Sequence, residues 1–226
     1  MRVYGALSLK SSSIMRCNVG IIDYGCGNLR SIENALQYLK APHGVISSPS
    51  EIASFDALIL PGVGSFKRAM DRLSRSGMAD EIKNVVLNGG VNILGICLGM
   101  QLLAESGTED GECVGLGLMP GRIEKISSDK ATLKVPHVGF NLVNPFDGVL
   151  FKNFTKPANF YFVHSYALYE TSNVAKVGFC EYGKQFIAAY ENQNVFGTQF
   201  HPEKSQTNGL ILLNNFLNLK ACLKKD

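Results

Sequence analysis

Several features that would point to a special partner or environment are absent from this sequence of 226 residues. It contains no tryptophan, and its 22 Lys and Arg residues nearly balance its 19 Asp and Glu residues, for a net charge of +3. Lys and Arg form no long run, whereas a nucleic-acid-binding surface normally requires a concentrated basic patch. Runs of about 18 apolar residues are also missing, and a membrane-spanning helix needs one. We therefore expect neither nucleic acid nor a membrane as a partner.

Signals for disulfides, metals and cofactors are equally sparse. The six cysteines, at positions 17, 26, 97, 113, 180 and 222, show neither CxxC spacing nor the density of a small secreted domain. None of the four histidines has a histidine or cysteine three or four residues away, so no metal site is expected. The glycine-rich turn that follows residue 23 lacks the G-x-G-x-x-G pattern and a Walker lysine, so no cofactor is expected. These absences predict a cytoplasmic protein with reduced thiols.

The length and composition predict a single domain over residues 1–226. A hydrophobic fraction of 46% is enough for a substantial core at this chain length. Residues 1–17 contain a short apolar stretch and a cluster of serines, but not the longer apolar core of a signal peptide. We expect this segment to be a frayed extension, while a transit peptide or a start at Met15 stays open.

The two halves of the chain show different patterns. The first half alternates apolar runs typical of buried strands with segments of helical periodicity. The predicted strands are Val19–Asp23, Ala57–Leu60 and Val91–Ile96, and the predicted helices are Leu29–Leu39, Lys67–Leu73, Met78–Leu87 and Leu98–Glu105. From about Gly115 the chain predicts short strands at Gly121–Ile126, Thr132–Val135, Asn159–Val163, Ala175–Cys180, Phe186–Tyr190 and Val195–Gln199, and then a helix over Asn208–Leu219. His43 is predicted to lie in a surface turn. The pattern predicts an α/β fold with an open, mainly parallel sheet flanked by helices, and an added antiparallel section.

The clearest chemical signal is the segment Leu94-Gly95-Ile96-Cys97-Leu98-Gly99-Met100-Gln101. Glycines two positions before and after Cys97 allow neighbouring backbones to pass close to a strained turn between a strand and a helix. In such a turn the thiol lies at a helix N-terminus, which favours the reactive thiolate. Cys97 is therefore a candidate nucleophile, and the alternative is a small buried core cysteine.

A thiolate needs a partner for proton transfer, and the segment Phe200-His201-Pro202-Glu203 provides one. An apolar strand leads into His201, and Pro202 ends the regular structure. Glu203 lies two residues further on, where its carboxylate can accept a hydrogen bond from the distal ring nitrogen and set the tautomer. Taken alone, this pattern also fits a loop histidine beside an exposed acid. Together with the cysteine turn it predicts a Cys-His-Glu triad.

With these motifs the chain resembles the class I (triad-type) glutamine amidotransferases, and among them the glutaminase subunits of imidazole glycerol phosphate synthases. The likeness covers about residues 18–220 in collinear order. The segments that carry it are Asp23–Leu29, Leu60–Gly64, Gly95–Gln101, Gly115–Leu118, Pro136–Asn141, Tyr161–Tyr166 and Phe200–Gln206. The resemblance implies a flavodoxin-like sheet and an enzyme that hydrolyses glutamine to glutamate and ammonia through a cysteinyl thioester.

The resemblance also assigns roles to individual residues. Cys97 would attack the side-chain amide, His201 would transfer protons, and Glu203 would orient His201. The backbone N–H of Leu98 and one from the Pro61–Gly64 strand, assigned to Gly64, would hold the oxyanion, and such donors each contribute about 3 kcal/mol. Four more residues are implied to bind glutamine, namely Gln101, Glu109, Ser165 and Tyr166.

The family couples glutamine hydrolysis to a synthase, which implies a partner. The glutaminase pattern occupies about 200 residues and leaves no room for a (β/α)8 barrel, so a barrel cyclase is expected as a separate subunit of a heterodimer. His137 and Phe140 are implied interface residues. The family's usual Pro-His-Met-Gly-Trp-Asn is here Pro136-His137-Val138-Gly139-Phe140-Asn141, and the missing tryptophan leaves open a paralogue that supplies ammonia to an amidino-forming, sugar-modifying barrel.

Two further functions stay open at this point. A stand-alone cysteine hydrolase of another amide would use the same triad, but Gln101 and the Tyr161–Tyr166 segment match glutamine recognition. A catalytically inactive binding module on the same fold would not need Cys97, His201 and Glu203 together.

Overall fold

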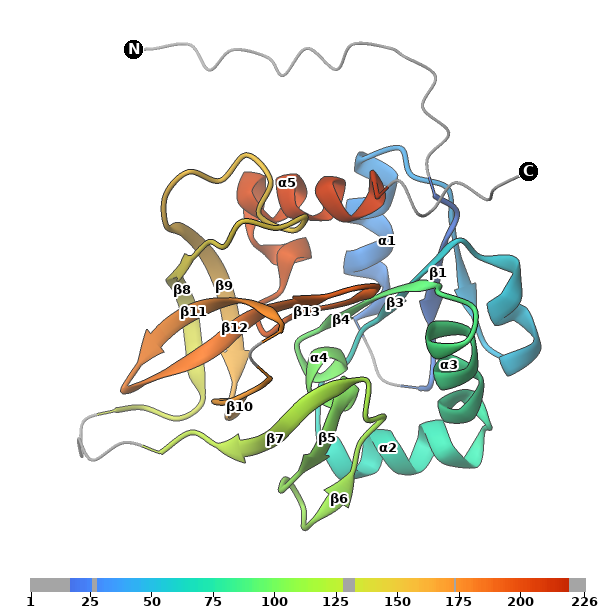
Figure 1. Ribbon diagram of the computed structural model, residues 1–226, viewed down its shortest axis with the longest axis horizontal. Helices are drawn as coiled ribbons and strands as arrows, with labels where there is room; N and C mark the ends of the chain where they lie inside the picture. The colour runs from blue at the N-terminus through green and yellow to red at the C-terminus, as the bar shows by residue number, and fades with distance from the viewer. Residues whose placement is uncertain (1–16, 26–27, 128–132, 173, 220–226) are drawn as a thin grey trace.

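The computed structural model describes residues 17–25, 28–127, 133–172 and 174–219 (Figure 1). Residues 1–16, nearly all of the predicted frayed extension, lie outside this range. Every strand of the described residues belongs to one mixed sheet that is covered by helices on both faces over its parallel half (Figure 1). This arrangement confirms the predicted α/β class.

The parallel half of the sheet has the order β2-β1-β3-β4-β13, and all of its neighbouring strands run parallel. Its members are β1 (Val19–Ile22), β2 (His43–Ile46), β3 (Ala57–Leu60), β4 (Asn92–Ile96) and β13 (Val195–Thr198). With β13 as the fifth strand, this is the 2-1-3-4-5 order of flavodoxin-like folds, in which ligands bind beyond the carboxyl ends of the strands. The fold therefore directs attention to the residues that follow β3, β4 and β13.

Helices enclose these strands and divide the core into two apolar layers. Alternate residues of one strand join different layers, as Ile59 and Leu58 do in β3. One layer lies under α1 (Leu29–Tyr38) and α5 (Gln206–Leu217), and the other under α2 (Phe66–Arg75), α3 (Met78–Leu87) and the short α4 (Leu98–Leu103). Strands buried on both faces read as continuous apolar runs, which is why β1, β3 and β4 were predictable.

The antiparallel section extends the sheet from β13. Next to it lie β12 (Lys184–Asn192), β10 (Tyr166–Leu168), β7 (Met119–Lys125), β5 (Ala104–Gly107) and β6 (Cys113–Val114). A branch from β12 carries β11 (Lys176–Tyr182), β8 (His137–Asn144) and β9 (Ala158–His164). The described residues also include two 3-10 turns, η1 (Pro49–Ser54) and η2 (Pro202–Lys204). The section brings β9 and β10 beside the carboxyl ends of β4 and β13.

Several predicted elements were wrong or missed. His43 begins strand β2 rather than a surface turn. Residues 133–135 are not a strand, and residue 132 lies outside the described ranges. The strands that were missed are β2, β5, β6, β8 and β10. On β8 the apolar residues Val138, Phe140 and Leu142 are 57%, 50% and 52% exposed, so its apolar side faces outward and inverts the usual pattern. The helix predicted to reach Glu105 ends at Leu103, because strand β5 begins at the next residue, Ala104.

The cysteines differ partly from expectation. Cys97, Cys113 and Cys180 are free thiols, as predicted. Cys17 is disulfide-bonded, so the expectation of reduced thiols is wrong at that position.

No helix within the described residues is long and apolar enough to cross a membrane.

Candidate active site

Cys97 occupies a sharp turn between β4 and α4. Its φ of 55° and ψ of −111° lie in a region that side chains rarely adopt, and its side chain is almost fully enclosed. Glycines permit the close packing around it: a Cβ at Gly99 would lie 1.7 Å from the carbonyl oxygen of Leu60, and one at Gly95 would lie 2.6 Å from the backbone of Met100. The strained backbone presents the thiol at the carboxyl end of the parallel strands.

His201 and Glu203 form a buried pair next to this turn. His201 follows β13, which is the parallel neighbour of β4, and Glu203 lies on η2. The ring Nδ1 of His201 is 2.8 Å from Oε1 of Glu203, and the two side chains are 1% and 0% exposed. The other ring nitrogen, Nε2, is buried and has no hydrogen-bond partner among the described residues. The pair therefore leaves one imidazole nitrogen available for proton transfer.

The charges around His201 favour its protonated form. Burial by itself lowers the pKa of His201, but the interactions of the ring with the neighbouring Cys97 and Glu203 outweigh burial and raise this pKa to about 10. At neutral pH the ring is then an imidazolium held between a carboxylate and the thiol. A cation beside a thiol favours the thiolate, which is the nucleophilic form.

The Cys97 sulfur has two further weak contacts. Its thiol donates to the carbonyl oxygen of Val163 at 3.8 Å, and the amide Nε2 of Gln199 donates to the sulfur at 3.8 Å. Both distances are long, which suits a sulfur that must leave these contacts during a reaction.

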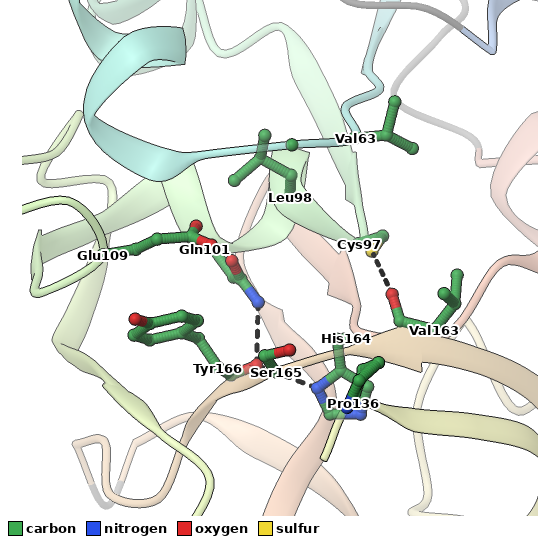
Figure 2. A pocket seen from close by; sticks show the side chains of 11 residues that line it. Val63, Cys97, Leu98, Gln101, Glu109, Pro136, Val163, His164, Ser165 and Tyr166 are labelled. Atoms are coloured by element: carbon green, nitrogen blue, oxygen red, sulfur yellow. Dashed lines mark hydrogen bonds between the residues drawn. The ribbon is translucent and has the colours of Figure 1, made fainter.

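A pocket of about 250 Å³ opens beside Cys97 (Figure 2). Seven predicted site residues line it, namely Gly64, Cys97, Leu98, Gln101, Glu109, Ser165 and Tyr166. They come from the β3–α2 loop, the turn and helix Cys97–Gln101 that follow β4 (the elbow), the β5–β6 turn and the β9–β10 junction. The tertiary structure therefore brings together residues spread over about a hundred positions of the chain.

Gln101 is held in one orientation. Its Nε2 donates to the carbonyl oxygen of Tyr166 at 2.9 Å and to Oε1 of Gln199 at 2.9 Å. With both amide hydrogens used by protein acceptors, the amide oxygen is the group left to accept a hydrogen bond from a ligand.

Glu109 provides negative charge to the pocket. Its Oε2 accepts a hydrogen bond from the backbone N–H of Phe66 at 2.9 Å. Burial raises the pKa of Glu109, and the Phe66 hydrogen bond partly offsets that rise. In Figure 2 this carboxylate lies across the pocket from Cys97.

The loop after β3 forms the remaining wall. Gly64 has a φ of +106°, a conformation that favours glycine, and lines the pocket, as Leu98 does. The loop is fastened at its start, because the Tyr24 hydroxyl donates to the carbonyl oxygen of Pro61 at 2.9 Å.

The two residues predicted to contact a partner differ in exposure. Phe140 is half exposed on β8 and makes an edge contact with Tyr161. His137 is buried, stacks on Tyr182 and Phe162, and has its Nδ1 3.0 Å from Nε2 of His164. Its side chain does not face solvent, so the interface prediction now rests on Phe140.

Sequence reasoning did not single out Asn28, Tyr24, Gln199 or Val163. Asn28 and Tyr24 lie in the Asp23–Leu29 segment that carries the family resemblance, and Gln199 lies two residues before His201. The sequence therefore pointed to these segments but not to the individual residues. No group of three or more His, Cys, Asp or Glu side chains in the described part of the chain is arranged to hold a metal ion.

Comparison with known proteins gives a consistent result. Residues 20–219 match the family "Glutamine amidotransferase class-I". A protein of Leptospira borgpetersenii named imidazole glycerol phosphate synthase subunit HisH is 40% identical, with 89% of this chain and 100% of that protein covered. A protein of the same name from Moorella thermoacetica is 44% identical, with 88% and 93% covered. A crystal structure of a glutamine amidotransferase shares the fold, with a TM-score of 0.72 at 20% identity over 91% of this chain and 99% of that one.

Proposed function

The chain belongs to the class I glutamine amidotransferases, and we propose that it is the glutaminase subunit of an imidazole glycerol phosphate synthase in histidine biosynthesis. The observation that carries this proposal is the buried Cys97-His201-Glu203 constellation, which opens onto a pocket lined by the residues expected to bind glutamine. Relatives that are 40% and 44% identical over nearly their whole length bear the name of this synthase subunit.

The first chemical stage forms a thioester. The Cys97 thiolate attacks the side-chain carbonyl carbon of glutamine, and the negative charge moves onto the amide oxygen. The backbone N–H groups of Leu98 and Gly64 are proposed to stabilise that oxyanion. The His201 imidazolium donates its Nε2 proton to the departing nitrogen, so the C–N bond breaks and ammonia leaves.

The second stage regenerates the enzyme. His201, now neutral, takes a proton from water as the water oxygen attacks the thioester carbonyl carbon. The tetrahedral intermediate collapses, the C–S bond breaks, and the γ-carboxylic acid that forms loses its proton to solvent as glutamate is released. The Cys97 thiolate and the His201 imidazolium are restored together. Glu203 holds the ring through its 2.8 Å hydrogen bond in both stages and does not itself transfer a proton.

The pocket provides groups for the two charged ends of glutamine. We propose that Glu109 binds the α-ammonium group, because its carboxylate lies across the pocket from the thiol (Figure 2). The backbone of Ser165 and Tyr166 and the amide oxygen of Gln101 are proposed to bind the remaining polar groups. Gln101 is suited to this role because its amide nitrogen is already held by Tyr166 and Gln199.

Ammonia needs an acceptor, so we propose a heterodimer with a separate (β/α)8-barrel cyclase. The relatives are themselves named as subunits of a synthase. The exposed apolar face of β8 around Phe140 is the surface proposed to meet that partner. Since the chemistry is biosynthetic and uses free glutamine, we place it in the cytoplasm.

The decisive experiment measures glutamate release by the purified chain, alone and mixed with a histidine-pathway barrel cyclase. We expect little activity alone and a rise of at least about 100-fold with the barrel and its nucleotide substrate, which is the effect of completing one oxyanion-hole donor. A parallel mixture with an amidino-forming barrel tests the paralogue. Stimulation only by that second barrel would overturn the pathway, and high activity without any barrel would overturn the requirement for a partner.

A further inference from the structure

Asn28 stands at the start of α1 but does not cap it. Asparagine is among the preferred N-cap residues because its side-chain oxygen normally accepts a hydrogen bond from the first turn of the helix. Here Asn28 has a left-handed backbone, with φ 86° and ψ 13°, and its side chain makes no such bond. Such a bond stabilises the start of a helix, so a side chain that forgoes it makes its contact elsewhere.

The Asn28 side chain contacts the catalytic carboxylate instead. Its Nδ2 donates to Oε1 of Glu203 at 2.7 Å, across 175 positions of the chain. The same oxygen is 2.8 Å from Nδ1 of His201. The second oxygen of Glu203, Oε2, is buried and lacks a hydrogen-bond partner in the part of the chain that the structure describes. Asn28 and His201 are thus the two hydrogen-bond donors recorded on this carboxylate.

These contacts constrain how the carboxylate can move. A carboxylate held by one donor can rotate about its terminal bond and present either oxygen. A second donor on the same oxygen opposes this rotation, and a hydrogen bond to an ionised group is stronger than one between neutral groups. Asn28 is itself well anchored, because α1 buries Ile32 and Leu36 in the core.

We propose that Asn28 is a positioning residue of the glutaminase site, which fixes Oε1 of Glu203 toward His201 and so extends the triad to the β1–α1 turn. This inference rests on the proposed glutaminase function but concerns a residue to which that function assigns no role. It also places the start of α1 in the same network as the nucleophile, although Asn28 does not line the glutamine pocket.

We expect the loss of the Asn28 hydrogen bond to act through the charge state of His201. The groups that face His201 are Cys97 on the elbow, Glu203 on η2 and His164 on β9. Glu203 helps to raise the pKa of His201 to about 10. If Glu203 rotates away, that pKa falls, so the imidazolium beside the Cys97 sulfur is less populated at neutral pH.

Two variants separate the donor role from a purely structural role at the start of α1, where the Asn28 side chain makes no capping hydrogen bond. Asn28→Ser keeps a good N-cap residue but is too short to reach Glu203. Asn28→Asp keeps the shape and the capping ability but replaces the amide donor with a second carboxylate. If the amide positions Glu203, both variants lose activity, and Asp is at least as damaging as Ser. If Asn28 serves only α1, both remain close to wild type. Asn88→Ser, at an exposed asparagine that ends α3, is the matched control.

Two readouts test the proposal. For glutamine hydrolysis with the barrel partner, we expect kcat to fall about tenfold, KM to change less than about twofold, and the alkaline limb of the pH profile to move down by about one unit. For iodoacetamide at pH 7, we expect the alkylation rate of Cys97 to fall at least about threefold. Cys113, which is partly exposed, is the internal reference, and buried Cys180 reports unfolding.

The outcomes are distinguishable from failure of the proposed function. Alkylation of Cys97 requires neither glutamine nor a partner, so it tests Asn28 even if no barrel stimulates hydrolysis. Wild-type alkylation and kcat in either variant overturn the proposal. Unfolding of both Asn28 variants, with Asn88→Ser folded, also overturns it, because the amide would then serve the fold rather than the site.

Discussion

The parallel half of the sheet and the antiparallel section contribute differently to this protein. The parallel strands β3, β4 and β13 end in the β3–α2 loop, the Cys97 elbow and the His201 segment, which carry the proposed bond-making groups. The antiparallel section provides Ser165 and Tyr166 on the pocket wall and the exposed face of β8. One half therefore holds the reacting atoms, and the other holds the substrate wall and the proposed partner surface.

The difference teaches where strain and exposure are tolerated. Cys97 adopts an unfavourable backbone conformation, which survives because buried strands and close glycine contacts surround it. β8 departs from another rule, the burial of apolar side chains, because three of them remain exposed on one of its faces. A contiguous apolar surface of this kind marks an interaction site. If this division is correct, changes in the two halves should separate chemistry from assembly.

The largest expected effect comes from the parallel half. Cys97→Ala should reduce glutamine hydrolysis by at least about 10⁴-fold, because no other group replaces the nucleophile. Partner binding should be unchanged, since Cys97 is enclosed. Glutamate release and a binding titration check these two points, with Cys113→Ala as the matched control. Substantial remaining hydrolysis in Cys97→Ala would refute the assignment of the nucleophile.

The antiparallel section should show the reverse behaviour. Phe140→Ala should weaken binding of the barrel partner about 30-fold, which is the effect of losing an interface hot spot. Hydrolysis at saturating partner should change little. Leu87→Ala on α3 is the control, because Leu87 is an apolar residue of the parallel half that is even more exposed, at 67% against 50% for Phe140. Equal dissociation constants for Phe140→Ala and the wild type would place the interface elsewhere.

The buried histidines of the antiparallel section should make stability depend on acid. Burial lowers the pKa of His137 to about 4 and, as the largest of several causes, that of His164 to about 3. Because these values lie below the ordinary 6.5, the unfolded chain binds more protons between about pH 4 and 6.5. The free energy of unfolding should therefore fall as the pH drops through this window, by about 1.4 kcal/mol per unit for each histidine.

His137→Phe tests this pH effect. Phenylalanine can keep the stacking on Tyr182 and Phe162 but cannot take up a proton. Urea unfolding of both proteins at a series of pH values from 7.5 downward measures this effect. The free energy of unfolding should fall less steeply with decreasing pH in the variant than in the wild type. Parallel slopes would mean that His137 does not contribute to the acid sensitivity.

The smallest effect concerns the strain at the elbow. Glycine adopts a positive φ without steric cost, so Cys97→Gly should be more stable than Cys97→Ala by about 1 kcal/mol. Urea unfolding of the two inactive variants at neutral pH measures the difference. If Cys97→Ala is as stable as Cys97→Gly, the turn stores no strain and the contrast between the two halves is weaker.

The two halves also differ in how far the sequence predicts them. The bounds predicted for β3 and α3 agree with the structure residue for residue. Elements buried on both sides have strong apolar periodicity, and this signal is local. β2 and β8 were missed because their half-exposed residues mix apolar, polar and glycine positions. β8 even turns its apolar side outward, which fits the partner surface proposed there.

For the site, the sequence by itself determined the chemistry: a cysteine between glycines after an apolar strand, and a histidine with an acid two residues on. These signals lie within a few neighbouring residues, so local sequence is enough to specify them. Only the tertiary structure decided that Gly64, Glu109 and Tyr166 share one pocket, that His137 is buried, and that Asn28 reaches Glu203. Strand order and helix packing bring such distant positions together, and no short stretch of sequence encodes them.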